Sequence, residues 1–399
     1  MIENQYVDGI LDNDQYKFSM QNAVCFNYPR AMVKYAFINR DNREFPDGFG
    51  EELKRVIDTF RGFEMSKGEK YFLSKKCTYL NPVYIDFLYG YRFNPDEVTV
   101  IQQGPKLIVE IAGPWYRTIL WEVPLMATIS QLYFEMAKLI IVKYSREERE
   151  KINKNKGQEL KQMGVRAAEF GTRRRESLQN HKEVIVDLKE SMEDLLVGAS
   201  NVKLAMENSL TPIGTHAHEW FMFHAARFGF RMANNIALKT WVKTYQGDLG
   251  IALPDTFTTD VFLRDFDSLY ARQFDGVRHD SGAPVEFMYK IVEHYSKLRI
   301  DPSTKTIVFS DGINNMALIR SIHAACEKII RDSYGIGTWF TNDVGLIPLN
   351  IVIKMTSCLV KDNWVPTIKL SDNKGKNTGD PEMIDLCKKT FNIDDRRRF

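Results

Sequence analysis

The stretch AAEFGTRRR, residues 167–175, shows the pattern that decides the fold. A short apolar run ends in a turn of glycine and polar residues, and a helix-forming segment follows. The same order returns at DLLVGASN (194–201), LTPIGTHAHEW (210–220), LGIALPDT (249–256), FDGVRHDSG (274–282), TIVFSDGIN (306–314) and DSYGIGTWF (332–340). Seven strand–loop–helix units in a row predict an α/β fold, in the form of a parallel αβ barrel.

The segments that flank these units predict a second, smaller domain. VTVIQQGPKLIVEIAG (98–113) alternates apolar and polar residues around a Gly-Pro pair, which predicts a β-hairpin. PLNIVIKMTSCLVKDNWVPTIKLSD (348–372) predicts another hairpin, turning at Asp362-Asn363. We therefore predict an N-terminal α+β domain over residues 1–145, completed by about 348–399, and a barrel domain over 146–347.

Three further helices are predicted outside the barrel units. LDNDQYKFSMQNAV (11–24) has apolar residues at helical spacing, with Asp12 or Asn13 as the cap. The stretch 121–142 is largely apolar and predicts a second helix. The stretch 143–166 is dense in charge and predicts a solvated amphipathic helix.

Composition restricts the possible partners. The chain has 54 basic and 52 acidic residues, a net charge of +2, which argues against a general nucleic-acid or membrane-surface binder. The five cysteines are widely scattered without a CxxC spacing, which predicts reduced thiols and a cytoplasmic protein. The start lacks an apolar signal core, and no apolar run is long enough to span a bilayer.

Polar residues gather where the predicted strands end, and in a barrel these ends face one site. The arginines are Arg173, Arg174 and Arg278, the carboxylates are Asp255, Asp280 and Asp311, the histidines are His216 and His218, and the glycines include Gly312, Gly335 and Gly337. Arginine forks and glycine-rich turns bind phosphate, and carboxylates bind sugar hydroxyls or Mg²⁺. The set predicts a pocket for a phosphorylated sugar. Phe170 and Tyr16 suit a stacked heterocycle, although for Tyr16 its spacing favours ordinary core packing.

These stretches resemble the nicotinate phosphoribosyltransferase family. The resemblance rests on DNDQYKFSMQ, YRFNPDEVTV, GPWYRTILWEVPL, EFGTRRR, TPIGTHAHEW, LGIALPDTFTTDVFLRDF, RHDSGAPVE, VFSDGIN, YGIGT, LNIVIKM and KLSDNKGK. It implies an irregular TIM-like αβ barrel beside a smaller mixed α+β domain. The implied enzyme joins nicotinate to phosphoribosyl pyrophosphate in NAD salvage, giving nicotinate mononucleotide and pyrophosphate. It also implies coupling to ATP hydrolysis through a phosphohistidine (a ligase-type reaction), use of Mg²⁺, and a homodimer.

The resemblance also implies roles for single residues. His218 is the phosphorylated histidine, and Asp255 orients its imidazole. Phe170 and Tyr16 sandwich the pyridine ring, with Tyr16 coming from the other subunit of the dimer. The remaining contacts are Arg173 and Arg174 to phosphates, Arg278 to the nicotinate carboxylate or the pyrophosphate, Asp280 to the ribose hydroxyls, and Ser310, Asp311, Gly312, Gly335 and Gly337 to the 5′-phosphate.

Substrate choice leaves alternatives open. Ser200 stands where nicotinamide-using relatives carry a carboxylate, and its hydroxyl is able to donate to a carboxylate substrate, which favours nicotinate. Two departures from the family pattern are Ala283, where an acid is expected, and His216, where a neutral polar residue is expected. The alternatives are a transferase for nicotinamide or quinolinate, a non-catalytic nucleotide sensor on the same fold, and an aldolase-like barrel using Lys354.

Overall fold

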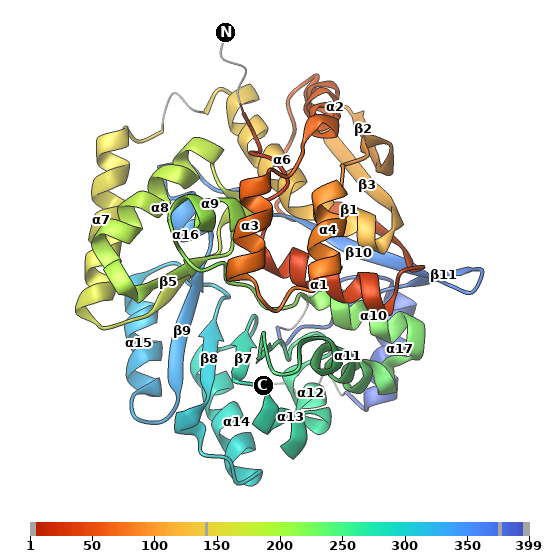
Figure 1. Cartoon of the computed structure of the whole chain (residues 1–399), viewed down its shortest axis with the longest axis vertical. Coiled ribbons are helices and arrows are strands. Elements are labelled where there is room, and N and C mark those ends of the chain that lie inside the picture. The colour runs from red at the N-terminus through yellow and green to blue at the C-terminus, as the bar shows by residue number, and fades with distance from the viewer. Residues whose placement is uncertain (1–4, 140–142, 374–376, 394–399) are drawn as a thin grey trace.

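The computed structural model describes residues 5–139, 143–373 and 377–393, and its strands form two sheets (Figure 1). The first is antiparallel, in the order β11-β10-β1-β3-β2. Its strands are β1 (Met32–Asn39), β2 (Val98–Gln103), β3 (Lys106–Pro114), β10 (Ile351–Val360) and β11 (Asn363–Pro366). Because β10 pairs with β1, the C-terminal segment completes the sheet that the N-terminal strands begin. Both predicted hairpins are present, and the second turns at residues 361–362, one position early.

The second sheet is parallel throughout, in the order β5-β4-β9-β8-β7-β6. Its strands are β4 (Ala167–Glu169), β5 (Leu196–Ala199), β6 (Ile251–Ala252), β7 (Gly276–His279), β8 (Thr306–Phe309) and β9 (Arg331–Ile336). The helices that accompany these strands are α7 (Arg146–Gln162), α8 (Leu178–Met192), α9 (Val202–Glu207), α10 (His218–Phe228), α11 (Phe230–Tyr245), α12 (Thr259–Asp265), α13 (Ser268–Gln273), α14 (Pro284–Lys297), α15 (Met316–Cys326) and α16 (Thr338–Thr341).

The third predicted unit, 210–220, was wrong as a strand. It meets β5 only through an isolated bridge between Ala199 and Pro212. Its two hydrogen bonds, from Ala199 to the carbonyl of Thr211 at 3.1 Å and from Ile213 to the carbonyl of Ala199 at 2.9 Å, are not extended into a ladder. The segment instead lies against the start of α1 (Gln15–Asn27), where a Cβ on Gly214 would lie 2.6 Å from the backbone nitrogen of Tyr16. The barrel is therefore irregular, with a non-strand segment between β5 and β6.

The remaining α-helices are α2 (Phe49–Thr59), α3 (Lys67–Lys76), α4 (Pro82–Gly90), α5 (Trp115–Thr118), α6 (Glu122–Met136) and α17 (Pro381–Phe391). The apolar helix predicted over 121–142 is α6, whose predicted last residues, 140–142, lie outside the described part of the chain. The charged helix is α7, which packs one face on α8. No helix in the described ranges has both the length and the apolar character needed to cross a membrane.

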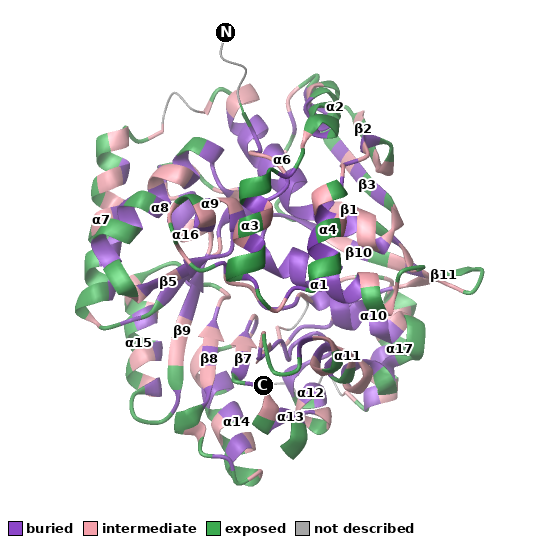
Figure 2. Ribbon diagram, viewed as in Figure 1, coloured by how far each residue is buried: buried purple, intermediate pink, exposed green. Residues whose placement is uncertain are grey.

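Helix α1 is deeply buried although it carries many polar side chains. All residues from Gln15 to Val24 are buried, as Figure 2 shows in purple. Its polar groups bond to both domains: Gln21 donates to the carbonyl of Tyr116 at 2.7 Å, and Asn22 donates to the hydroxyl of Tyr245 in α11 at 3.0 Å. Hydrogen bonds of this kind offset the cost of burying polar groups.

The predicted cap of this helix was also wrong. The helix begins at Gln15 after Asp14, which makes no side-chain cap. Asp12 binds Arg175 instead, with its carboxylate oxygens 2.8 and 2.7 Å from the two terminal nitrogens. Burial would raise the pKa of Asp12, but the charge and hydrogen bonds of Arg175, together with hydrogen bonds from the Asp8 N–H and Asn201, lower that pKa to about 2. The last arginine of the 173–175 triplet thus has a carboxylate of this chain as its partner.

Candidate active site

The barrel strand ends and α1 meet at a cavity of about 790 Å³. The predicted site residues that line it are Tyr16, Phe170, Arg173, Arg174, His218, Arg278, Asp280, Ser310, Gly335 and Gly337. A second cavity shares Arg173, Arg174, Asp280 and Ser310 with the first and adds Asp311. The structure therefore brings together residues that lie more than 300 positions apart, and most of them are guanidinium, hydroxyl or carboxylate groups.

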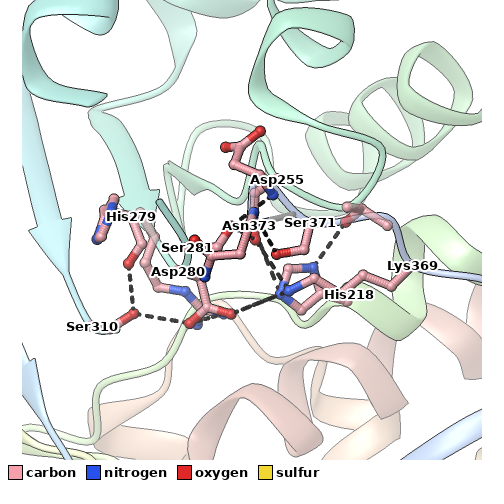
Figure 3. Close-up of polar contacts among 12 residues, drawn as sticks. His218, Asp255, His279, Asp280, Ser281, Ser310, Lys369, Ser371 and Asn373 are labelled. Atoms are coloured by element: carbon pink, nitrogen blue, oxygen red, sulfur yellow. Dashed lines mark hydrogen bonds and ion pairs between the residues drawn. The ribbon is translucent and has the colours of Figure 1, made fainter. Parts of the chain in front are cut away.

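His218, the first residue of α10, is the centre of the polar contacts (Figure 3). Its Nδ1 is 3.0 Å from the hydroxyl of Thr256. Its Nε2 is 2.7 Å from Asp280 Oδ2 and 2.7 Å from Lys369 Nζ. Burial and the charge of Lys369 lower the pKa of His218 to about 4, against the opposing effect of the carboxylates. The imidazole is therefore neutral at physiological pH, as a nucleophile must be.

One ring nitrogen cannot donate to Asp280 and accept from Lys369 at once. The two contacts correspond to the two tautomers of a neutral imidazole. When Nδ1 carries the proton and donates to Thr256, Nε2 has a free lone pair that accepts from Lys369. When Nε2 carries the proton, it donates to Asp280. The first tautomer is the one with a nucleophilic nitrogen facing the cavity.

Asp255 does not orient the imidazole directly, contrary to the prediction. Its Oδ1 is 3.6 Å from His218 Nε2, longer than a hydrogen bond. Its Oδ2 accepts from Ser281 at 2.6 Å and lies 3.1 Å from Lys369 Nζ. Thr256 and Asp280 make the contacts expected of Asp255. Neighbouring residues in a loop point in different directions, so the sequence did not distinguish Asp255 from Thr256.

Lys369 was missed by the sequence interpretation. It follows β11, far in sequence from the barrel loops, and its Nζ lies 2.7 Å from His218 Nε2, 3.1 Å from Asp255 and 3.8 Å from Asp280 (Figure 3). Ligand atoms of these three partners lie within 4.8 Å of one another, a grouping that is able to hold a metal ion. An ammonium group supplies the positive charge at this point. The only sequence signal was KLSDNKGK, quoted for its resemblance alone.

Arg173 and Arg174 line both cavities, and the second cavity contains a further arginine, Arg40. Burial first, and then the charges of Arg173 and Arg40, lower the pKa of Arg174 to about 10. Arg278 donates to the hydroxyl of Thr215 at 2.7 Å. Arg40 and Lys354, which sequence reasoning did not place here, also line this cavity. Cations placed this close to Arg174 favour the binding of an anion between them.

Two of the predicted glycines shape the wall beside Phe170. A Cβ on Gly335 would lie 2.4 Å from the Phe170 ring, and one on Gly337 would lie 3.3 Å from its carbonyl oxygen. Only glycine leaves room for the ring at position 335. Gly312 does not line either cavity; its φ of +68° serves the turn after Asp311. Tyr16 and Phe170 line the same cavity.

Ser200 and His216 do not have the surroundings expected of them. The Ser200 hydroxyl donates to Asp14 at 2.7 Å, and Ser200 lines neither cavity, so it gives no support for a choice between nicotinate and nicotinamide. His216 accepts from the Leu253 N–H at 3.3 Å and packs against aromatic rings of the core. Burial lowers its pKa to about 3, so it is a neutral structural histidine.

Comparisons with known proteins agree along the whole chain. Residues 165–395 match the model of the nicotinate phosphoribosyltransferase (NAPRTase) family, and residues 11–130 match its N-terminal domain. A nicotinate phosphoribosyltransferase of Chromohalobacter salexigens is 50% identical over 397 residues, covering 98% of this chain and 100% of the relative. One of Desulforapulum autotrophicum is 52% identical, covering 96% of this chain and 99% of the relative.

Solved structures show the same likeness. The crystal structure of nicotinate phosphoribosyltransferase from Porphyromonas gingivalis superposes with a TM-score of 0.93 at 42% identity, covering 97% of this chain and 100% of that one. A putative nicotinate phosphoribosyltransferase from Saccharomyces cerevisiae superposes with a TM-score of 0.92 at 33% identity, covering 99% and 100%. The two-domain α/β fold predicted from the sequence is thereby confirmed.

Proposed function

The chain belongs to the nicotinate phosphoribosyltransferase family, and from that premise we propose that it couples the transfer to ATP hydrolysis through a phosphohistidine at His218. The transfer itself follows from the named relatives: the protein is a nicotinate phosphoribosyltransferase. The observation that supports the coupling is the neutral, buried imidazole of His218 in the wall of a cavity lined by arginines.

The transfer needs positioning more than acid–base chemistry. The pyridine nitrogen of nicotinate attacks C1′ of phosphoribosyl pyrophosphate, and the C1′–oxygen bond breaks as pyrophosphate leaves with the electron pair. We infer that Phe170 and Tyr16 hold the pyridine ring, because both line the same cavity. Arg174 and Arg40 are placed to stabilise the charge of the departing pyrophosphate. Arg173 lines both cavities, and we assign it to the carboxylate of the ring instead of to the phosphates that the resemblance implied. Ser310 and Asp311 fit a role at the 5′-phosphate.

The phosphohistidine step uses the contacts around His218. Nε2 attacks the γ-phosphate of ATP, ADP leaves, and Thr256 holds the Nδ1 proton while the bond forms. Lys369 is placed to bind the arriving phosphoryl oxygens and Asp280 to accept the Nε2 proton in the resting tautomer. Hydrolysis of the phosphohistidine then returns neutral His218 and inorganic phosphate.

The oxygens of Asp280 and Asp311 suit Mg²⁺, a hard cation that prefers carboxylate and phosphate ligands. Bound there together with a polyphosphate, Mg²⁺ would neutralise part of the negative charge. Asp280 and Asp311 line the second cavity together with Arg173 and Arg174, so these two carboxylates would hold the ion beside a bound polyphosphate. A cytoplasmic location is also proposed, which fits five cysteines that form no disulfide with one another.

The test is turnover with labelled nicotinate and phosphoribosyl pyrophosphate, with and without ATP. We expect nicotinate mononucleotide in both cases, a higher rate with ATP, and ADP released during turnover. A preference for nicotinamide or quinolinate would favour the corresponding transferase instead, and binding without turnover would favour a nucleotide sensor. Product formation at the same rate in both reactions, with no ADP, would contradict the proposed coupling.

A homodimer remains a prediction, and with it the exchange of Tyr16 between subunits. Variants Tyr16→Ala and Phe170→Ala each remove one wall and should each lower activity. If Tyr16 serves its own chain, as its place in the cavity indicates, mixing the two variants after joint refolding restores nothing. If Tyr16 crosses over, a mixed dimer contains one site with both walls, and activity returns in part. Light scattering of each sample gives the mass.

A further inference from the structure

A buried ammonium group lies directly behind the cavity wall. The side chain of Lys17, in α1, has 0% exposure, and its Nζ is 2.5 Å from Glu122 Oε2 and 2.7 Å from Glu219 Oε2. The two glutamates line the cavity, whereas Lys17 does not. Burial alone would lower the pKa of Lys17, but the two carboxylates outweigh burial and raise it. Lys17 is therefore a fixed positive charge at physiological pH.

The two glutamates have different second partners. Glu122, in α6, is 3.4 Å from Arg173 Nη1, and this arginine also lines the cavity. Glu219, the residue after His218 in α10, accepts from the Trp115 indole at 3.3 Å and from the Tyr35 hydroxyl at 3.4 Å. The network thus joins α1, α6, α10 and the arginine loop, and it reaches the cavity through Arg173.

The balance of charges in this network affects how the cavity binds an anionic substrate. Lys17 pairs with both Glu122 and Glu219, and Glu122 is also near Arg173 and the charge of Lys354. Without Lys17, Glu219 would keep no ion-pair partner among the described residues, and Arg173 and Lys354 would be left to balance Glu122. Arg173 would be drawn toward Glu122, and the cavity would present more negative charge to its substrate. Nicotinate is an anion, so this change would weaken its binding specifically.

We propose that Lys17 is a specificity-determining residue: by neutralising Glu122 and Glu219 it leaves Arg173 able to bind the carboxylate of a pyridine substrate. Lys17 acts through these neighbours and does not touch the substrate. The inference rests on the proposed function, because it takes nicotinate as the ring that enters the cavity. It adds a role for a residue that neither the strand-end pattern nor the arginine triplet indicated.

The test compares an anionic and a neutral ring of the same shape. Lys17→Met should raise the Michaelis constant for nicotinate about tenfold or more, the loss expected when a charge-assisted hydrogen bond is weakened. The inhibition constant of nicotinamide should change by less than about threefold, because that ring carries no charge. Glu219→Gln should shift the nicotinate constant the other way, and Lys17→Met/Glu219→Gln should return it near the wild-type value.

The matched control is Lys203→Met, which breaks the 3.0 Å pair of Lys203 and Glu69 outside both cavities and should change neither constant. Equal weakening of nicotinate and nicotinamide in Lys17→Met would overturn the proposal, as would a folded double variant that still binds nicotinate weakly. If Lys17→Met does not fold, the Glu219→Gln variant tests the proposal instead. Nicotinate binding by Glu219→Gln that is unchanged or weaker than in the wild type overturns the proposal. Absence of nicotinate turnover by the wild-type enzyme would instead contradict the proposed function.

Discussion

His218→Ala is expected to abolish ATP hydrolysis and the stimulation of transfer by ATP, while a slow, ATP-independent transfer survives. The variant removes the only imidazole that lines the cavity among the described residues. The aromatic walls and the arginines stay in place, so binding and charge stabilisation continue. We expect the ATP-stimulated rate to fall about 10²-fold or more. The measurements are ADP release, nicotinate mononucleotide formation, and acid-labile label from γ-labelled ATP.

The fold should tolerate this change. Asp280 and Lys369 are 3.8 Å apart and remain able to pair when the imidazole is gone. His323→Ala is the control, since His323 pairs with Asp332 at 2.8 Å and lines neither cavity. It should retain ATP hydrolysis. Acid-labile label that persists in His218→Ala would show that another residue is the phosphoryl acceptor.

Lys369→Met is expected to slow phosphorylation of His218 about 10²-fold, because it removes a preorganised positive charge from the place where phosphoryl oxygens arrive. It should also shift the acidic limb of the pH–rate profile. Lys369 lowers the pKa of His218, so without it this pKa rises from about 4 toward its ordinary value. The imidazole then takes up a proton at a higher pH, and activity is lost earlier on acidification. Rapid quench with γ-labelled ATP measures the step.

Loss of stability has to be separated from loss of chemistry in this variant. Lys369→Met leaves the buried Asp255 without its cation, at a cost of about 3–5 kcal/mol. Lys156→Met is the control for loss of a buried lysine, because the Lys156 side chain is buried and its Nζ is 2.6 Å from Asp343 outside both cavities. Since Asp343 is partly exposed, this variant should lose less stability than Lys369→Met, and it should keep phosphorylation. Lys369→Met/Asp255→Asn should recover stability only; recovery of phosphorylation as well would rule out a catalytic role for Lys369.

The convergence of the strand ends was predictable, because it depends on a pattern that repeats along the chain. Short apolar runs that end in Arg173, Asp280 or Gly335 place those residues at one edge of a parallel sheet. The pattern failed at 210–220, where pairing with β5 is limited to one bridge and the segment packs on α1. The local sequence indicates which structure a segment favours, but the conformation of 210–220 depends on its contact with α1, which is distant in the sequence.

The choice of partner for each polar side chain was not predictable. Asp12 read as a helix cap but binds Arg175, and Ser200 read as a substrate contact but binds Asp14. Both partners come from segments more than 150 positions away. Lys17 and Lys369 reach the site from the two ends of the chain, so neither lies in one of the strand–loop–helix units from which the site was predicted. Which side chains pair depends on their distances in the folded protein, and the sequence alone does not give those distances.

Helix α1 limits how this enzyme can be re-engineered. Its first turns hold Tyr16 in the cavity and Lys17 behind it, while Gln21 and Asn22 anchor it to both domains. Replacing the first thirty residues with those of a relative would therefore exchange Lys17 and its neighbours in α1 without exchanging the glutamates that pair with Lys17. A functional chimera would have to carry over the acceptors at Glu122 and Glu219 as well, so the natural module for recombination is discontinuous in the gene.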